Sequence, residues 1–121
     1  MMMEEQSKRF LVKNEDTALA FGSGDLLVLA TPRLIAMLEN TAKEMPLELL
    51  KDDETTVGIE MNLKHLKATA VGKEVVCFAK LTEIKKSILF FEIKATVGED
   101  VIATGTHIRA IVNKQLFMKK I

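Results

Sequence analysis

His65 is the residue in this sequence whose type and position point most directly to chemistry. It closes the run from Thr56 to His65, in which apolar and polar residues alternate, and it shares the parity of the apolar ones. In a β-strand this parity directs the imidazole to the same face as the apolar side chains. A neutral imidazole is the commonest general base near neutral pH. Two interpretations are open at this point, a general base and a hydrogen-bonded core histidine.

Thr31 and Glu39 lie on the segment that most clearly predicts a helix. Thr31 directly precedes Pro32, so its hydroxyl could cap the helix, and the free N–H groups there could also stabilise an oxyanion. Glu39 falls about 40° beyond Ile35 at roughly 100° per residue, at the edge of the apolar stripe. A carboxylate held at such an edge is partly desolvated, which makes it a better base. A helix cap and a solvated surface carboxylate are the respective alternatives.

These residues need a long helix and a sheet to position them. Apolar residues at helical spacing predict a helix from about Pro32 to Met45, with Thr31 as its N-cap and, after Pro46, a short turn at 47–50. Alternation predicts four strands, and a first strand and a turn or short helix could precede the long helix. In chain order, these other segments are Ser7–Lys13, Asp16–Gly24, Thr56–His65, Glu74–Ile84, Ile88–Val97 and Val101–Val112.

The arrangement of these elements predicts an α+β fold. Short connections at 71–73, 85–87 and 98–100 favour an antiparallel meander of the four strands. The apolar stripe of the helix is wide and uncharged, as expected for a helix that a curved sheet largely encloses. We therefore expect an antiparallel sheet of about five strands wrapped around one long central helix, in a single domain over residues 1–121. The buried face of the strand that ends at His65 should comprise Val57, Ile59, Met61, Leu63 and His65.

Composition and charge exclude several classes of protein. With 17 basic and 17 acidic residues the net charge is zero, which argues against nucleic acid or an anionic membrane surface as a partner. No run approaches the roughly 20 apolar residues of a membrane span, and the first residues lack a signal-peptide core. We therefore expect a cytoplasmic protein without a membrane partner. The one cysteine and two histidines form no zinc motif, so we expect no metal, and Cys77 should be a buried small hydrophobe.

Four short segments also stand in a characteristic order and spacing: Leu29-Ala30-Thr31-Pro32 followed by Glu39, then Thr56-Val57-Gly58, His65 to Gly72, and Gly105 to Ala110. Together they resemble the hot-dog thioesterases, in particular the fluoroacetyl-CoA thioesterase family. The resemblance implies a hot-dog fold that hydrolyses an acyl-CoA thioester to free CoA and a carboxylic acid, without a cofactor. It assigns catalysis to Thr31, Glu39 and His65, and it places Gly58 and Arg109 in the acyl-CoA pocket. Residues 22–28 lack the phenylalanine-rich lid of the fluoroacetate enzyme, so the acyl group stays open.

Spacing constrains the roles that the resemblance assigns. His65 would act as general base oriented by Glu39, and Thr31 would either attack the thioester or position water; both routes stay open. A backbone N–H near Gly58 or at the helix start would hold the oxyanion. Thr31 and Glu39 are eight residues apart, which is roughly 12 Å along a helix axis. A site that uses all three residues is therefore simplest across a two-fold interface, and we expect a homodimer or higher oligomer.

Two alternatives are open. The guanidinium of Arg109 could meet a CoA phosphate, or it could pair with an acid of the protein. The alternative function is a non-catalytic hot-dog domain that binds acyl-CoA or another small ligand. Such a domain needs Arg109 and an apolar tunnel, but it tolerates loss of Glu39 and His65.

Overall fold

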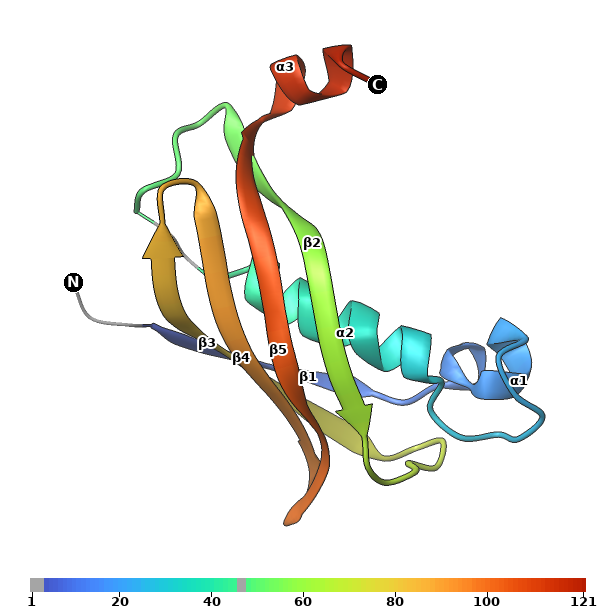
Figure 1. The fold of residues 1–121 in the computed structure, drawn as a ribbon. Helices are drawn as coiled ribbons and strands as arrows, with labels where there is room; N and C mark the ends of the chain where they lie inside the picture. The colour runs from blue at the N-terminus through green and yellow to red at the C-terminus, as the bar shows by residue number, and fades with distance from the viewer. Residues whose placement is uncertain (1–3, 46–47) are drawn as a thin grey trace.

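In the computed structural model, which describes residues 4–45 and 48–121, one long helix lies across one face of a five-stranded antiparallel sheet (Figure 1). The elements are β1 (Glu5–Leu11), the 3-10 turn η1 (Asn14–Asp16), α1 (Ala18–Phe21), α2 (Thr31–Lys43), β2 (Glu54–His65), β3 (Glu74–Lys85), β4 (Ile88–Val97), β5 (Asp100–Asn113) and α3 (Lys114–Lys119). This arrangement confirms the predicted α+β class. The turn predicted at 47–50 lies partly outside the described residues. None of the helices within the described ranges is long and apolar enough to span a membrane.

The order of the strands differs from the predicted meander. β3, β4 and β5 follow one another through two hairpins, but β2 pairs with β5 and lies at an edge, in the order β1-β3-β4-β5-β2. The hairpin predicted between β2 and β3 is therefore wrong. Residues 66–73 use their backbone hydrogen bonds elsewhere, because Leu66 N–H donates to Ile102 O (2.7 Å) and Thr69 O accepts from Leu29 N–H (2.8 Å). These bonds hold the connection at the end of the sheet and leave the outer edge of β2 without a strand partner among the described residues.

The start of α2 differs from the prediction by one residue, and this changes what Thr31 does. α2 begins at Thr31 and ends at Lys43, its N-cap is Ala30, and no side chain caps it. The prediction that Thr31 caps the helix is therefore wrong. The helix start is fixed from outside, because Ala30 N–H donates to Asp16 O (2.9 Å) and Arg33 Nε donates to Asp16 Oδ1 (2.9 Å). The Thr31 hydroxyl is therefore free for another partner.

The core lies between α2 and the face of the sheet that α2 covers. The buried residues of α2 are Leu34, Met37, Leu38, Thr41 and Ala42. Ile35, which the predicted stripe included, is only half-buried. β3 contributes alternate buried residues, as its pattern predicts: Val75, Cys77, Ala79 and Leu81. Cys77 is thus the buried small hydrophobe that we expected, and burial raises the pKa of its thiol to about 12, which leaves no reactive thiolate at neutral pH.

A β-bulge at Ile59 reverses the parity of β2. Gly58 and Glu60 pair with consecutive residues of β5, so Ile59 is an extra residue in this strand. Ile59 is 55% exposed and Val57 is half-buried, so the prediction that these two belong to the buried face is wrong. Before the bulge the buried residue is Thr56. Beyond the bulge the predicted parity holds, and Met61 and Leu63 pack against the core.

We expect Gly105→Ala to destabilise the protein, because β5 and β2 approach closely at this residue. A Cβ atom on residue 105 would overlap the carbonyl oxygen of Asn62 in the paired strand. Overpacking typically costs about 1–3 kcal/mol, and backbone cannot rotate out of the way. The free energy of unfolding in urea measures the effect. Thr106→Ala, at the neighbouring exposed position, is the control and should change this free energy by less than about 0.5 kcal/mol. Equal losses in the two variants would contradict the close approach.

Candidate active site

A cleft of about 340 Å³ opens where α2 begins and β2 ends. Its walls come from residues between 18 and 29, from the first two residues of α2 and from residues 65–68. In Figure 1, α1 lies beside the N-terminal end of α2, which places these segments together. Two of the predicted catalytic residues, Thr31 and His65, line this cleft.

Thr31 Oγ1 and His65 Nδ1 lie 2.7 Å apart, which is a hydrogen-bond distance. Burial of the ring lowers the pKa of His65, and the nearby Lys67 backbone offsets only part of this effect, so the imidazole is neutral at pH 7. In the neutral ring, Nδ1 can accept the hydroxyl proton of Thr31 while Nε2 carries the hydrogen. Nε2 is buried and has no hydrogen-bond partner among the described residues. The pair has the arrangement of a nucleophile and its general base.

Glu39 lies outside this cleft, against the middle of β2. Its carboxylate is so close to the bare Cα of Gly58 that a Cβ atom on residue 58 would lie 2.5 Å from Glu39 Oε2. Arg109 Nη1 lies 3.8 Å from the same oxygen, and the Glu39 side chain is 40% exposed. We expected Glu39 to orient the ring of His65. Within the described chain Glu39 faces Arg109, and His65 Nδ1 bonds to Thr31 instead.

Arg109 is buried beside Glu39 and is held from two sides. Its Nε donates to Thr56 Oγ1 (2.8 Å) and its Nη2 donates to Thr56 O (3.0 Å). Its Nη1 lies 3.1 Å from His107 Nε2. Of the two interpretations of Arg109, pairing with an acid describes its place within the chain, because its side chain is 7% exposed and faces Glu39.

The structure thus separates the five predicted site residues into two groups, Thr31 with His65 in the cleft, and Glu39 with Gly58 and Arg109 beside β2. Sequence reasoning missed the two residues that hold Arg109. His107 had a usable signal, since it shares the parity of Arg109 on one strand. Thr56 had no such signal. The bulge turns its side chain inward, but the alternation of polar and apolar residues continues through the bulge without a break.

Comparison with known proteins identifies the family of this chain. The model of the fluoroacetyl-CoA-specific thioesterase (FlK) family matches residues 12–115. The chain belongs to this family. The curated fluoroacetyl-CoA thioesterase of Streptantibioticus cattleyicolor is 28% identical over 94 residues, which are 78% of this chain and 68% of that protein. The predicted family and the predicted enzyme class, a thioesterase, are confirmed.

Solved structures of the FlK family and of other hot-dog proteins share the fold. A structure of the fluoroacetyl-CoA thioesterase FlK superposes with a TM-score of 0.91 at 24% identity, and the match covers 99% of this chain and 93% of that one. A thioesterase superfamily member from Thermus thermophilus gives a TM-score of 0.88 at 20% identity, over 97% and 87% of the two chains. The predicted hot-dog fold is confirmed.

We expect the protein to lose stability as the pH falls from about 7.5 to about 5.5. Burial lowers the pKa of both His65 and His107 in the folded state, whereas the ordinary value is 6.5. As the pH falls through the ordinary value, the unfolded chain binds more protons than the folded chain. The free energy of unfolding therefore falls as the pH falls. Urea unfolding at both pH values measures this change. His65→Asn, which keeps a hydrogen-bonding side chain beside Thr31, should show a smaller decrease. An equal decrease in both proteins would contradict the lowered pKa of His65.

Proposed function

We propose that this chain hydrolyses acyl-CoA thioesters to free CoA and a carboxylic acid in the cleft that Thr31 and His65 line. One observation carries the proposal, a hydroxyl and a neutral imidazole 2.7 Å apart at the N-terminal end of a long helix. The first N–H groups of a helix have no partner within it and favour negative charge, which suits a thioester oxygen that becomes an oxyanion. Membership of the FlK family and the name of the curated relative support acyl-CoA as the substrate class.

The contact between Thr31 and His65 favours a covalent route. His65 Nδ1 takes the hydroxyl proton while Thr31 Oγ1 attacks the thioester carbonyl carbon, and a tetrahedral oxyanion forms. Its collapse breaks the C–S bond, and the imidazolium gives the proton to the departing CoA thiolate. Water then attacks the threonyl ester, again with His65 as base, which releases the acid and restores the hydroxyl. The N–H groups at the start of α2 are the better oxyanion donors, because Gly58 lies against Glu39 and away from the cleft.

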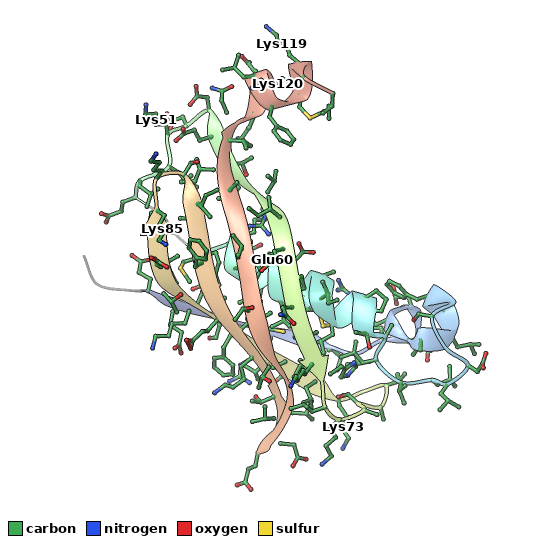
Figure 2. The ribbon with its side chains drawn as sticks, viewed as in Figure 1. Lys51, Glu60, Lys73, Lys85, Lys119 and Lys120 are labelled. Carbon is green, nitrogen blue, oxygen red and sulfur yellow. The ribbon has the colours of Figure 1, made fainter. Side chains whose placement is uncertain are left out.

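Basic residues near the cleft support CoA, a polyanion, as the carrier of the acyl group. A groove of about 960 Å³ shares Lys67 with the cleft, and its charged lining is mixed, with Lys73 and Arg9 beside Glu74, Glu99 and Asp100. Lys67 pairs with Asp100 (2.8 Å), but the two side chains are 57% and 58% exposed, so exchange of this partner for a phosphate costs little. Figure 2 shows Lys73 at this end of the sheet, and Lys119 at the end of α3 and Lys120 just after it at the opposite end. The C-terminal lysines therefore lie far from the cleft.

A second copy of the chain would complete this site with its Glu39. Thr31 and Glu39 belong to one helix, and in one chain only Thr31 reaches His65. The side chain of Glu39 is 40% exposed, so a second chain can reach it beyond its contact with Arg109. β2 is an edge strand, and pairing with a second β2 would cover that edge. These features support a homodimer in which Glu39 and the pair of Thr31 and His65 come from different copies.

The bulge at Ile59 defines the register that such a dimer requires. Because of the extra residue, Gly58 and His65 face the same side of β2. Antiparallel pairing with Gly58 of one copy opposite His65 of the other would bring Glu39 toward the other cleft. His65 Nε2 is buried in its own chain, so the incoming carboxylate would meet the exposed side of Thr31 and position the hydrolytic water there.

We expect Thr31→Ala, Glu39→Ala and His65→Ala each to lower kcat by about 100-fold or more, because each removes a nucleophile, a base or a positioning carboxylate. Thiol release from a panel of acyl-CoAs, from short to long and including aryl-acetyl forms, measures this and identifies the acyl group. Glu44→Ala is a matched control for Glu39→Ala, because both belong to the same helix region and their side chains are 41% and 40% exposed. Wild-type rates in two of the three variants would refute the assignment. Acyl-CoA binding without turnover in the wild type would support a non-catalytic ligand-binding domain.

We expect two inactive variants to restore activity when they are mixed. In a heterodimer of His65→Ala and Glu39→Ala chains, one of the two sites has both residues intact. After subunit exchange at equal concentrations, activity should therefore reach about a quarter of the wild-type value, because half of the dimers are mixed and half of their sites are complete. A mixture of Thr31→Ala and His65→Ala is the control and should stay inactive, because those residues act within one chain. Restoration in the control but not in the first mixture would contradict the shared site.

A further inference from the structure

We propose that His107 is a positioning residue of this site, which fixes the direction of the Arg109 guanidinium and thereby the place of the Glu39 carboxylate. The inference rests on the proposed function, in which Glu39 contributes to hydrolysis. Its role is separate from that of His65, the histidine in the cleft. Three contacts in the interior of the sheet carry it.

The bulge in β2 supplies the anchor for His107. The extra residue Ile59 interrupts the pairing with β5, and next to it the Glu60 carbonyl lies 2.8 Å from His107 Nδ1. Glu60 is labelled on β2 in Figure 2. A carbonyl oxygen can only accept, so Nδ1 carries the ring hydrogen and donates it. His107 is 1% exposed, so water does not compete for this bond.

This tautomer makes Nε2 of His107 an acceptor, and Arg109 is its donor. Arg109 Nη1 lies 3.1 Å from Nε2. Burial is the main cause that lowers the pKa of His107, and the charge of Arg109 acts in the same direction, whereas the bond to Glu60 and the charge of Glu39 offset only part of the decrease. The ring is therefore neutral at pH 7 and keeps the lone pair that Arg109 needs. A lysine or an apolar residue in place of His107 would supply no such acceptor.

With His107 and Thr56 engaged, the guanidinium of Arg109 has one orientation. Thr56 accepts from Nε and Nη2, and His107 accepts from Nη1 on the other side. Nη1 is then held 3.8 Å from Glu39 Oε2, which is longer than a hydrogen bond. The guanidinium thus attracts the carboxylate without a direct hydrogen bond. The carboxylate lies against Gly58, where a Cβ atom would be 2.5 Å from Glu39 Oε2. Without the acceptor on His107, the planar guanidinium is held on the Thr56 side alone, so it can shift as a unit until Nη1 bonds Glu39 directly, which displaces the carboxylate.

Two substitutions separate positioning from support of the sheet. The side chain of His107→Asn reaches about as far as Nδ1, so it keeps the bond to Glu60 but not the one to Arg109. The longer side chain of His107→Gln places its amide oxygen near Nε2, so it keeps the acceptor for Arg109. We expect His107→Asn to lower kcat by about tenfold or more with KM changed less than about twofold, and His107→Gln to stay within about threefold of wild type. Equal loss in both variants, or a loss confined to KM, would overturn the proposal.

The effect must also act through Arg109. In an Arg109→Lys background there is no guanidinium for His107 to orient. His107→Asn should therefore change kcat by less than about twofold in that background. Independent, additive losses would overturn the proposal. Ile93→Val, a core substitution on β4 at a position that pairs with Ala79 and Gly105, is the control for a general loss of stability, and thermal unfolding of every variant accompanies the kinetics.

A measurement on the tautomer needs no activity. The sequence has two histidines, so His65→Asn leaves one imidazole, and its nitrogen chemical shifts at pH 7 report the hydrogen position. A neutral ring with hydrogen on Nδ1 is the expected result; hydrogen on Nε2 or a charged ring overturns the proposal. If no acyl-CoA is hydrolysed but the tautomer is as expected, the proposed function fails and the geometry of His107 stands. If hydrolysis occurs and the tautomer differs, only the role of His107 fails.

Discussion

The β-bulge at Ile59 is the constraint on which the rest of the site depends. A regular strand would place Gly58 and His65 on opposite faces, because they are an odd number of residues apart. Because of the extra residue, Thr56 and Gly58 lie on the face of the sheet that α2 covers, and His65 lies on the same face. The same irregularity presents the Glu60 carbonyl to His107. One inserted residue thus sets the direction of the glycine that admits Glu39, the threonine that holds Arg109 and the histidine of the cleft.

A second constraint acts on the hydroxyl of Thr31. A threonine that caps a helix uses its oxygen to accept a backbone N–H, which stabilises the helix by about 1 kcal/mol. Here Ala30 occupies the cap position and forgoes that stabilisation. Asp16 compensates from outside, through its carbonyl to Ala30 and its carboxylate to Arg33. The hydroxyl of Thr31 is then one residue further along, where it meets His65. Capping and the contact with His65 compete for one oxygen, and the shift by one residue resolves the competition.

Local patterns predicted the elements of this fold but not the way in which they pair. Helical spacing located α2 and alternation located four strands, because both patterns depend only on residues that are close together in the sequence. The pairing of β2 with β5 depends on contacts far apart in sequence, and the short connection at 71–73 suggested a hairpin that does not form. The bulge left no sign, since the apolar residues at odd positions continue through Ile59. The face on which His65 lies was predictable, because the predicted parity holds after the bulge. The buried bonds of Thr56 to Arg109 were not predictable, because Thr56 lies before the bulge, where the parity is reversed.

The separation of the polar residues into two groups has a consequence for folding and assembly. Burial of a guanidinium is costly unless its donors are satisfied, and Arg109 finds Thr56, His107 and Glu39 within its own chain. The donors of Arg109 therefore find their partners without a second copy of the chain. The cleft differs, because the pair of Thr31 and His65 receives no carboxylate from its own helix. Under the proposed function, the Arg109 network is complete within one chain, whereas hydrolysis requires two chains. Dissociation should then abolish turnover at a protein concentration where the fold is still intact.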